Sequence, residues 1–118
     1  MSYNITAWKT KEISNLLIPL KVIADLPYTY IEVDGTSVNA KGLSEGFKLE
    51  GNLIDNNIVE VIKIKTSDDG SGSTWEFFLK MLEESRGVLI AIQIWEGGDS
   101  LSKLIVNNGE VIDEPYEL

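Results

Sequence analysis

The sequence contains no histidine and no cysteine among its 118 residues. Histidine is the commonest general acid and base near neutral pH and the commonest metal ligand, and cysteine supplies disulfides, thiolate ligands and a nucleophile. Their absence excludes Ser-His-Asp triads, Cys-His pairs, zinc sites of the usual kinds and the iron site of two histidines and one carboxylate. Any catalysis would depend on carboxylates, on a lysine or tyrosine base, or on an all-oxygen metal site.

Basic residues are also scarce. Ten Lys and Arg stand against nineteen Asp and Glu, which gives a net charge of −9. Residues 1–59 hold seven acids and five bases (net −2), whereas residues 60–118 hold twelve acids and five bases (net −7). Such a surface repels nucleic acids and anionic membranes and attracts basic proteins. We therefore expect a basic protein partner and no nucleic acid. The simpler alternative is that the charge serves solubility alone.

Long apolar stretches are missing too. The segment VLIAIQIW at 88–95 is far shorter than the roughly 20 residues that span a bilayer. The first residues lack a basic segment followed by an apolar one. We therefore predict a cytoplasmic protein without membrane contact. The length, with 43% hydrophobic and 25% charged residues, is typical of a single globular domain over residues 1–118.

Turn sequences between strand-like segments predict hairpins along most of the chain. Asp34-Gly35, Asp55-Asn56-Asn57 and Asn107-Asn108-Gly109 each separate two such segments. Gly51 indicates a bulge or a close backbone approach, and Pro115 indicates that the last strand lies at a sheet edge or ends there. Short links join antiparallel neighbours, so we predict seven or eight strands in a mainly antiparallel sheet.

The clearest helical pattern lies at residues 74–86. Ser73 and Glu76 fit a capping box, in which each side chain satisfies a backbone N–H at the start of the helix. Gly87 suits a left-handed cap at the other end. Helical spacing places the main apolar side chains on one face, namely Trp75, Phe78, Leu79 and Leu82.

The segment TKEISNLLIPL at 10–20 fits two structures. Apolar residues at helical spacing predict a short helix over roughly residues 10–18, followed by LKVIA in extended form. Pro19 works against a longer helix, and a strand across the whole segment is the alternative.

Together these elements predict an α+β fold, in which a curled, mainly antiparallel sheet carries one amphipathic helix. A β-barrel-like or sandwich closure is the alternative. Exposed hairpin edges make a homodimer a further expectation.

The stretch SDDGSGSTWEFF at 67–78 invites two site hypotheses, and both fail. With Gly72 at position six of a calcium loop, Phe78 occupies position twelve, where a glutamate is needed. With Gly70 at position six, Lys65 occupies position one. A phosphate loop would need the GK[ST] pattern, which the stretch lacks. The residues instead fit a turn followed by a capped helix.

A second acidic turn, WEGGDS at 95–100, leaves one binding hypothesis open. If the two turns meet, their carboxylates would form an oxygen-rich metal site or a carboxylate pair suited to glycoside hydrolysis. No residue specifies either chemistry, so we predict no metal and no cofactor. The candidate binding residues are Asp68, Asp69, Trp95, Glu96 and Asp99.

The excess of acids in the second half favours a non-catalytic role. We interpret the chain as a binding or inhibitor module that presents an acidic face, including Glu110, Asp113 and Glu114, to a basic protein. Small bacterial toxin-neutralising proteins and DNA-mimic inhibitors share this profile of one acidic domain. The alternative is a small-ligand-binding or carboxylate-based enzymatic domain with a pocket in the curled sheet. The strand lysines Lys63, Lys65 and Lys103 are interpreted as separate solvent-facing or edge charges that form no basic patch.

Overall fold

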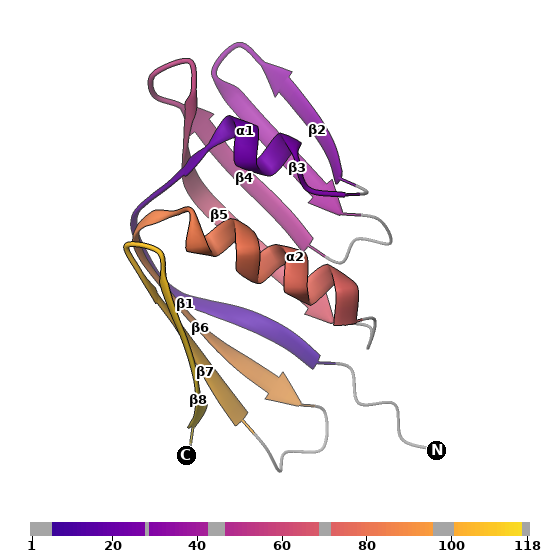
Figure 1. The fold of residues 1–118 in the computed structure, drawn as a ribbon, viewed down its shortest axis with the longest axis vertical. Coiled ribbons are helices and arrows are strands. Elements are labelled where there is room, and N and C mark those ends of the chain that lie inside the picture. Colours follow the sequence, from indigo (N-terminus) through magenta and orange to yellow (C-terminus); the bar gives the residue numbers. More distant parts are fainter. Residues whose placement is uncertain (1–5, 28, 43–46, 69–71, 96–100, 117–118) are drawn as a thin grey trace.

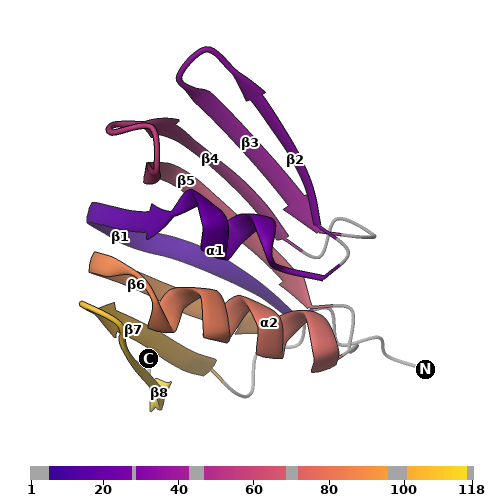
Figure 2. The same ribbon diagram turned by 45° about the horizontal axis from the view of Figure 1, so that its top comes forward.

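The protein is one open antiparallel sheet of eight strands with two helices on one face (Figures 1 and 2). The computed structural model describes residues 6–27, 29–42, 47–68, 72–95 and 101–116. The strand order is β2-β3-β4-β5-β1-β6-β7-β8, so β2 and β8 are the two edges and the sheet does not close. The elements are β1 (Thr6–Pro19), α1 (Leu20–Ala24), β2 (Thr29–Asp34), β3 (Ser37–Gly42), β4 (Phe47–Leu53), β5 (Ile58–Asp68), α2 (Gly72–Glu83), β6 (Arg86–Trp95), β7 (Leu101–Asn107) and β8 (Glu110–Tyr116).

The predicted antiparallel, curled sheet is confirmed, with eight strands, and the barrel-like closure is wrong. The structure is mostly β. Each predicted hairpin turn is present, and residues with positive φ occupy all three turns, as Gly35, Asn56 and Asn108 show. Gly51 lies at a register shift between β4 and β5, and its backbone approaches the carbonyl of Glu60. The close approach predicted for this glycine is therefore confirmed.

The predicted helix over residues 10–18 is wrong, because β1 runs extended from Thr6 to Pro19. Its register with β6 shifts twice, between Thr10 and Glu12 and again between Ser14 and Leu17, and Asn15 has a φ of +48°. Each register shift inserts one extra residue into β1, and this changes the face to which the following side chains point. The buried and half-buried apolar side chains of this segment consequently include Ile13, Leu16, Leu17 and Ile18, and the first three of them lie at helical spacing in the sequence.

LKVIA, expected to be extended, forms the short helix α1 instead. Pro19 occupies its N-cap with a φ of −58° and a ψ of 134°. Proline tolerates the start of a helix because the N–H that it lacks would have no intrahelical partner there. Ile23 then points into the core with no exposed surface.

The helix α2 connects two parallel strands that flank β1. Because β1 runs antiparallel to both β5 and β6, those two strands run in the same direction. A connection between parallel strands must cross the sheet, which α2 does in Figure 1. The chain therefore leaves β5 and β6 at the same end of the sheet.

The core lies between the sheet and the two helices. The ring centroids of Phe47 on β4 and Phe78 on α2 are 6.3 Å apart, within the usual range for aromatic contacts. Met81 and Leu82 are fully buried against the strands. The strand side chains in this core include Leu16, Ile18, Val38, Leu49, Val59, Leu89, Leu104 and Val106.

The helix α2 begins at Gly72 and ends at Glu83, two residues earlier than predicted at its start and three residues earlier at its end. Ser73 therefore lies in the first turn, although the capping box requires it to precede the helix. At the other end, the Ser85 hydroxyl donates a 2.6 Å hydrogen bond to the carbonyl of Leu82. Gly87 has the predicted positive φ, +91°, but it lies within β6. Among the described residues, no helix is long and apolar enough to cross a membrane.

Candidate functional site

The strand ends that lead into the two acidic turns lie on either side of β1. Asp68 on β5 and Trp95 on β6 are both register partners of Thr6. Neighbouring strands lie about 4.8 Å apart, so the two backbones are separated by about 10 Å. The other predicted binding residues, Asp69, Glu96 and Asp99, lie outside the described residues. Within the part of the chain that is described, no group of three or more acidic side chains is arranged to hold a metal ion.

The three acids predicted to form one face on β8 are divided between its two sides. Side chains alternate along a strand, so Glu110 and Glu114 share the side that faces away from the helices. Asp113 lies opposite buried Leu104 and therefore points toward the helix-covered side. Burial raises the pKa of the Asp113 carboxyl above its ordinary value of 3.8. The register thus gives Asp113 surroundings different from those of the other two acids.

The turn between β7 and β8 joins β8 to the end of α2. A Cβ atom on Gly109 would come within 2.5 Å of the carbonyl oxygen of Glu83, so the turn backbone lies directly on the helix end. Glu83, Glu84 and Glu110 are all exposed there. We call these three residues, together with Asp113 and Glu114 on β8, the acidic end. Three described bases lie on the same or adjoining elements, namely Lys80, Arg86 and Lys103.

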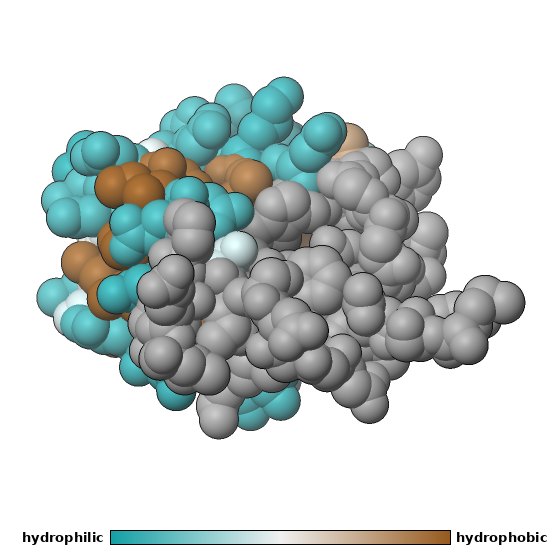
Figure 3. All heavy atoms as spheres, turned by 90° about the horizontal axis from the view of Figure 1, so that it is seen from below, coloured by the Kyte–Doolittle hydropathy of each residue, from teal (hydrophilic) through white to brown (hydrophobic). Residues whose placement is uncertain are grey.

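Figure 3 views the molecule from the side on which β7 and β8 lie in Figure 1. Its described surface is largely hydrophilic, with apolar patches between the polar side chains. Ile112 contributes one exposed apolar side chain on β8, with 42% of its surface accessible.

A row of lysines crosses the other half of the sheet. Lys41 on β3, Lys48 on β4 and Lys65 on β5 are successive register partners, and all three side chains are exposed. The residues that alternate with them, including Ala40, Leu49 and Ile64, are buried. The lysine row, as we call it, therefore lies on the face turned away from the helices. Tyr30 on β2 extends it, and the Lys41 Nζ lies 5.9 Å from the centre of its ring.

The prediction that the strand lysines form no basic patch is wrong for Lys65. The sequence contains no signal for this row, because Lys41, Lys48 and Lys65 are separated by connections of different lengths. Only the hairpin registers bring the three side chains into line.

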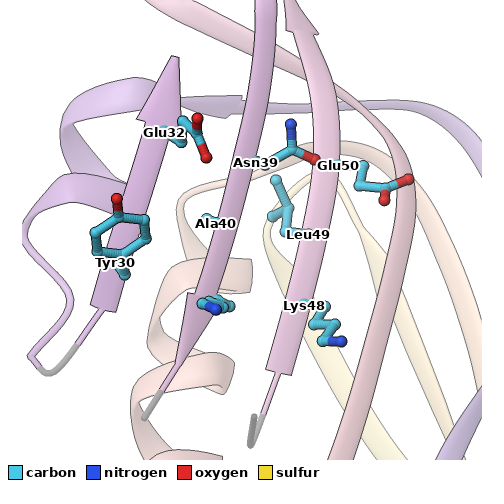
Figure 4. A pocket seen from close by; sticks show the side chains of 8 residues that line it. Tyr30, Glu32, Asn39, Ala40, Lys48, Leu49 and Glu50 are labelled. Atoms are coloured by element: carbon cyan, nitrogen blue, oxygen red, sulfur yellow. The ribbon is translucent and has the colours of Figure 1, made fainter. Parts of the chain in front are cut away.

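The lysine row borders a hollow of about 240 Å³ on the sheet surface (Figure 4). A second polar row, made of Glu32, Asn39 and Glu50, runs beside it across β2, β3 and β4. Figure 4 shows these side chains and those of Tyr30 and Lys48 at different heights along the strands. The hollow thus has a cationic side and an anionic side.

Comparisons with protein-family models, with curated proteins and with solved structures gave no match for this chain. Functional inference therefore depends on the acidic end and on the hollow. The acidic end presents carboxylates, and the hollow presents lysines, a tyrosine and carboxylates. Both present charges suited to reversible binding.

Proposed function

We propose that the protein is a non-catalytic binding or inhibitor module, and that it acts on a basic protein through the acidic end. The observation that carries this proposal is the gathering of three exposed carboxylates, those of Glu83, Glu84 and Glu110, around the β7–β8 turn, with Asp113 and Glu114 further along β8. The net charge of −9 adds a long-range attraction toward a cationic surface. The absence of histidine and cysteine from the sequence supports binding over catalysis.

Rigid placement of these carboxylates supports specific recognition. The backbone N–H of Asn108 donates to the carbonyl of Gly87 over 2.9 Å, and the Asn108 side-chain oxygen accepts the Gly87 N–H over 3.0 Å. The turn that precedes Glu110 is thereby fixed to β6. Charges held in place before association lose less conformational entropy when a partner binds.

Asp113 also favours binding of a cation at the acidic end. Its carboxylate is partly desolvated, which raises its pKa. A lysine or arginine of the partner placed near it would favour the charged form and offset that cost. The proposal places this encounter in the cytoplasm.

The test is capture of a partner from the source cell at low salt, followed by association kinetics. Wild-type protein is expected to retain a basic protein at about 20 mM salt and to release it at about 500 mM, because salt screens exposed charges. Reversal of Glu110 or of Glu114 to lysine, each alone, is expected to slow association about tenfold or more. Asp25→Lys, an exposed acid after α1, makes the same kind of charge change far along the chain and serves as the control.

Two results would refute the proposal. One is that no basic protein is retained at low salt. The other is that the Glu110 and Glu114 reversals slow association no more than Asp25→Lys does, because the effect would then be one of net charge. A small-ligand-binding role has a separate observation in its favour, namely the hollow beside the lysine row.

A further inference from the structure

The lysine row brings three ammonium groups onto one face across adjacent strands. Like charges directly opposite each other on neighbouring strands destabilise a sheet. Here Lys41 faces Lys48, and Lys48 faces Lys65. A chain with only ten bases among 118 residues nevertheless places three of them in register. An oxyanion near this row would meet ammonium groups from adjacent strands, which form charge-assisted hydrogen bonds with oxyanions.

The hollow beside the row supplies space and additional contacts for such an anion. Lys41 and Lys48 line its cationic side together with Tyr30, whose ring is 63% exposed. The Lys41 ammonium is 5.9 Å from the centre of that ring, close to the outer limit of about 6 Å for a cation–π contact. The ring therefore positions the Lys41 side chain and leaves its N–H donors available.

The side chains on the opposite side of the hollow determine which chemical groups the other end of the ligand carries. Glu32 and Glu50 lie two residues along their strands from Tyr30 and Lys48, which corresponds to about 7 Å. Their carboxylates accept hydrogen bonds and repel a second anion, and Asn39 between them offers both a donor and an acceptor. A polyanion is disfavoured by these carboxylates and by the net charge of −9.

We propose that this hollow binds a small molecule with one oxyanion and several hydrogen-bond donors. The oxyanion, a phosphate or a carboxylate, lies between Lys41 and Lys48. Hydroxyl or ammonium groups about 7 Å away lie against Glu32 and Glu50. This site is on β2–β4, at the opposite edge of the sheet from β8. It is independent of the acidic end, so either proposal can fail without the other.

Four probes test the chemistry by chemical-shift titration of the ¹⁵N-labelled protein. Glucose 6-phosphate and glucuronate each carry an oxyanion and hydroxyls, glucose carries hydroxyls only, and inorganic phosphate carries the oxyanion only. We expect saturable shifts in β2–β4 with one or both charged sugars by about 10 mM, where a millimolar site is nearly full. The tighter of the two identifies the oxyanion. Glucose and inorganic phosphate are expected to bind about tenfold more weakly, because each lacks one set of contacts.

Variants then locate the site. Lys48→Glu and Lys41→Glu are each expected to weaken binding of the charged sugar about tenfold or more, since each removes a charge-assisted hydrogen bond. Lys48→Gln, which is milder for folding, is expected to have a smaller effect in the same direction. Lys21→Glu on α1 is the matched control, because it makes the same charge change on the helix side. Thermal melting confirms that each variant is folded.

The proposal is overturned if neither charged sugar gives saturable shifts, or if Lys21→Glu weakens binding as much as Lys48→Glu. Binding of inorganic phosphate as tight as that of glucose 6-phosphate would overturn the role assigned to Glu32 and Glu50.

Discussion

Asn108 and Gly87 hold each other through two hydrogen bonds. The backbone N–H of Asn108 donates to the Gly87 carbonyl, and the Asn108 Oδ1 accepts the Gly87 N–H. The pair joins the β7–β8 turn to the first residues of β6, and so fixes Glu110 beside the end of α2. Asn108 also has a φ of +48°, which asparagine tolerates better than most residues.

Replacement of Asn108 separates the two roles of this residue. Asn108→Gly keeps the backbone conformation and loses the side-chain hydrogen bond, so we expect a loss of about 1 kcal/mol in the free energy of unfolding. Asn108→Ala loses both, and we expect about 2 kcal/mol. Urea unfolding measures the difference. Equal values for the two variants would show that the backbone conformation carries no cost.

Gly87 is expected to be among the least replaceable residues of the chain. Its φ is +91°, and a Cβ atom there would collide with the carbonyl oxygen of Asn15. We expect Gly87→Ala to destabilise the protein by about 2 kcal/mol or more. Gly35→Ala is the matched control, because Gly35 also has a positive φ, +62°, but has open space around it. Its cost is expected to be about 1 kcal/mol, from the backbone alone.

The raised pKa of Asp113 predicts a pH dependence with a definite sign. A carboxyl whose pKa is higher in the folded state binds its proton more strongly there than in the unfolded chain. Its stabilising contribution is complete below about pH 3.8 and is lost as the pH rises through the raised value. Asp113→Asn should therefore be more stable than wild type at pH 7, and the difference should disappear at low pH. Thermal melts of both proteins between about pH 3 and pH 7 measure this difference in stability. A difference that persists at about pH 3 would contradict the raised pKa of Asp113.

We expect millimolar Ca²⁺, Mg²⁺ or Mn²⁺ to leave the melting temperature unchanged. Neither glycine register of residues 67–78 provides the ligand positions of a calcium loop. A site with a dissociation constant of about 10 μM would add about 2.7 kcal/mol at 1 mM metal, a shift of several degrees. Such a shift in wild type that is absent in Asp68→Asn would restore the metal hypothesis for the two acidic turns.

The hairpins were predictable because their signals are local. Asp34-Gly35, Asp55-Asn56-Asn57 and Asn107-Asn108-Gly109 favour positive φ values over two or three residues, and all three turns formed where expected. The apolar face of α2 was predictable for the same reason. The extended form of β1 was not, because two register shifts give its buried residues a helix-like spacing. Strand pairing on both sides overrides that local pattern.

The lysine row could not be found from sequence. Its members become neighbours only when the registers of β3, β4 and β5 are known, and a shift of one residue would turn each side chain to the other face. The division of Glu110, Asp113 and Glu114 between two faces has the same origin. By contrast, the excess of acids in the second half follows from composition alone and does not depend on the strand registers.

The central position of β1 has a consequence for synthesis. Each of the two hairpin series, β2–β5 and β6–β8, pairs neighbours that follow one another along the chain. The strand at Thr6–Pro19 pairs instead with β5 and β6, which end at Asp68 and Trp95. Contacts this distant in sequence form slowly. During synthesis β1 emerges well before β5 and β6, so both of its hydrogen-bonding edges stay open to other chains until those two strands are made.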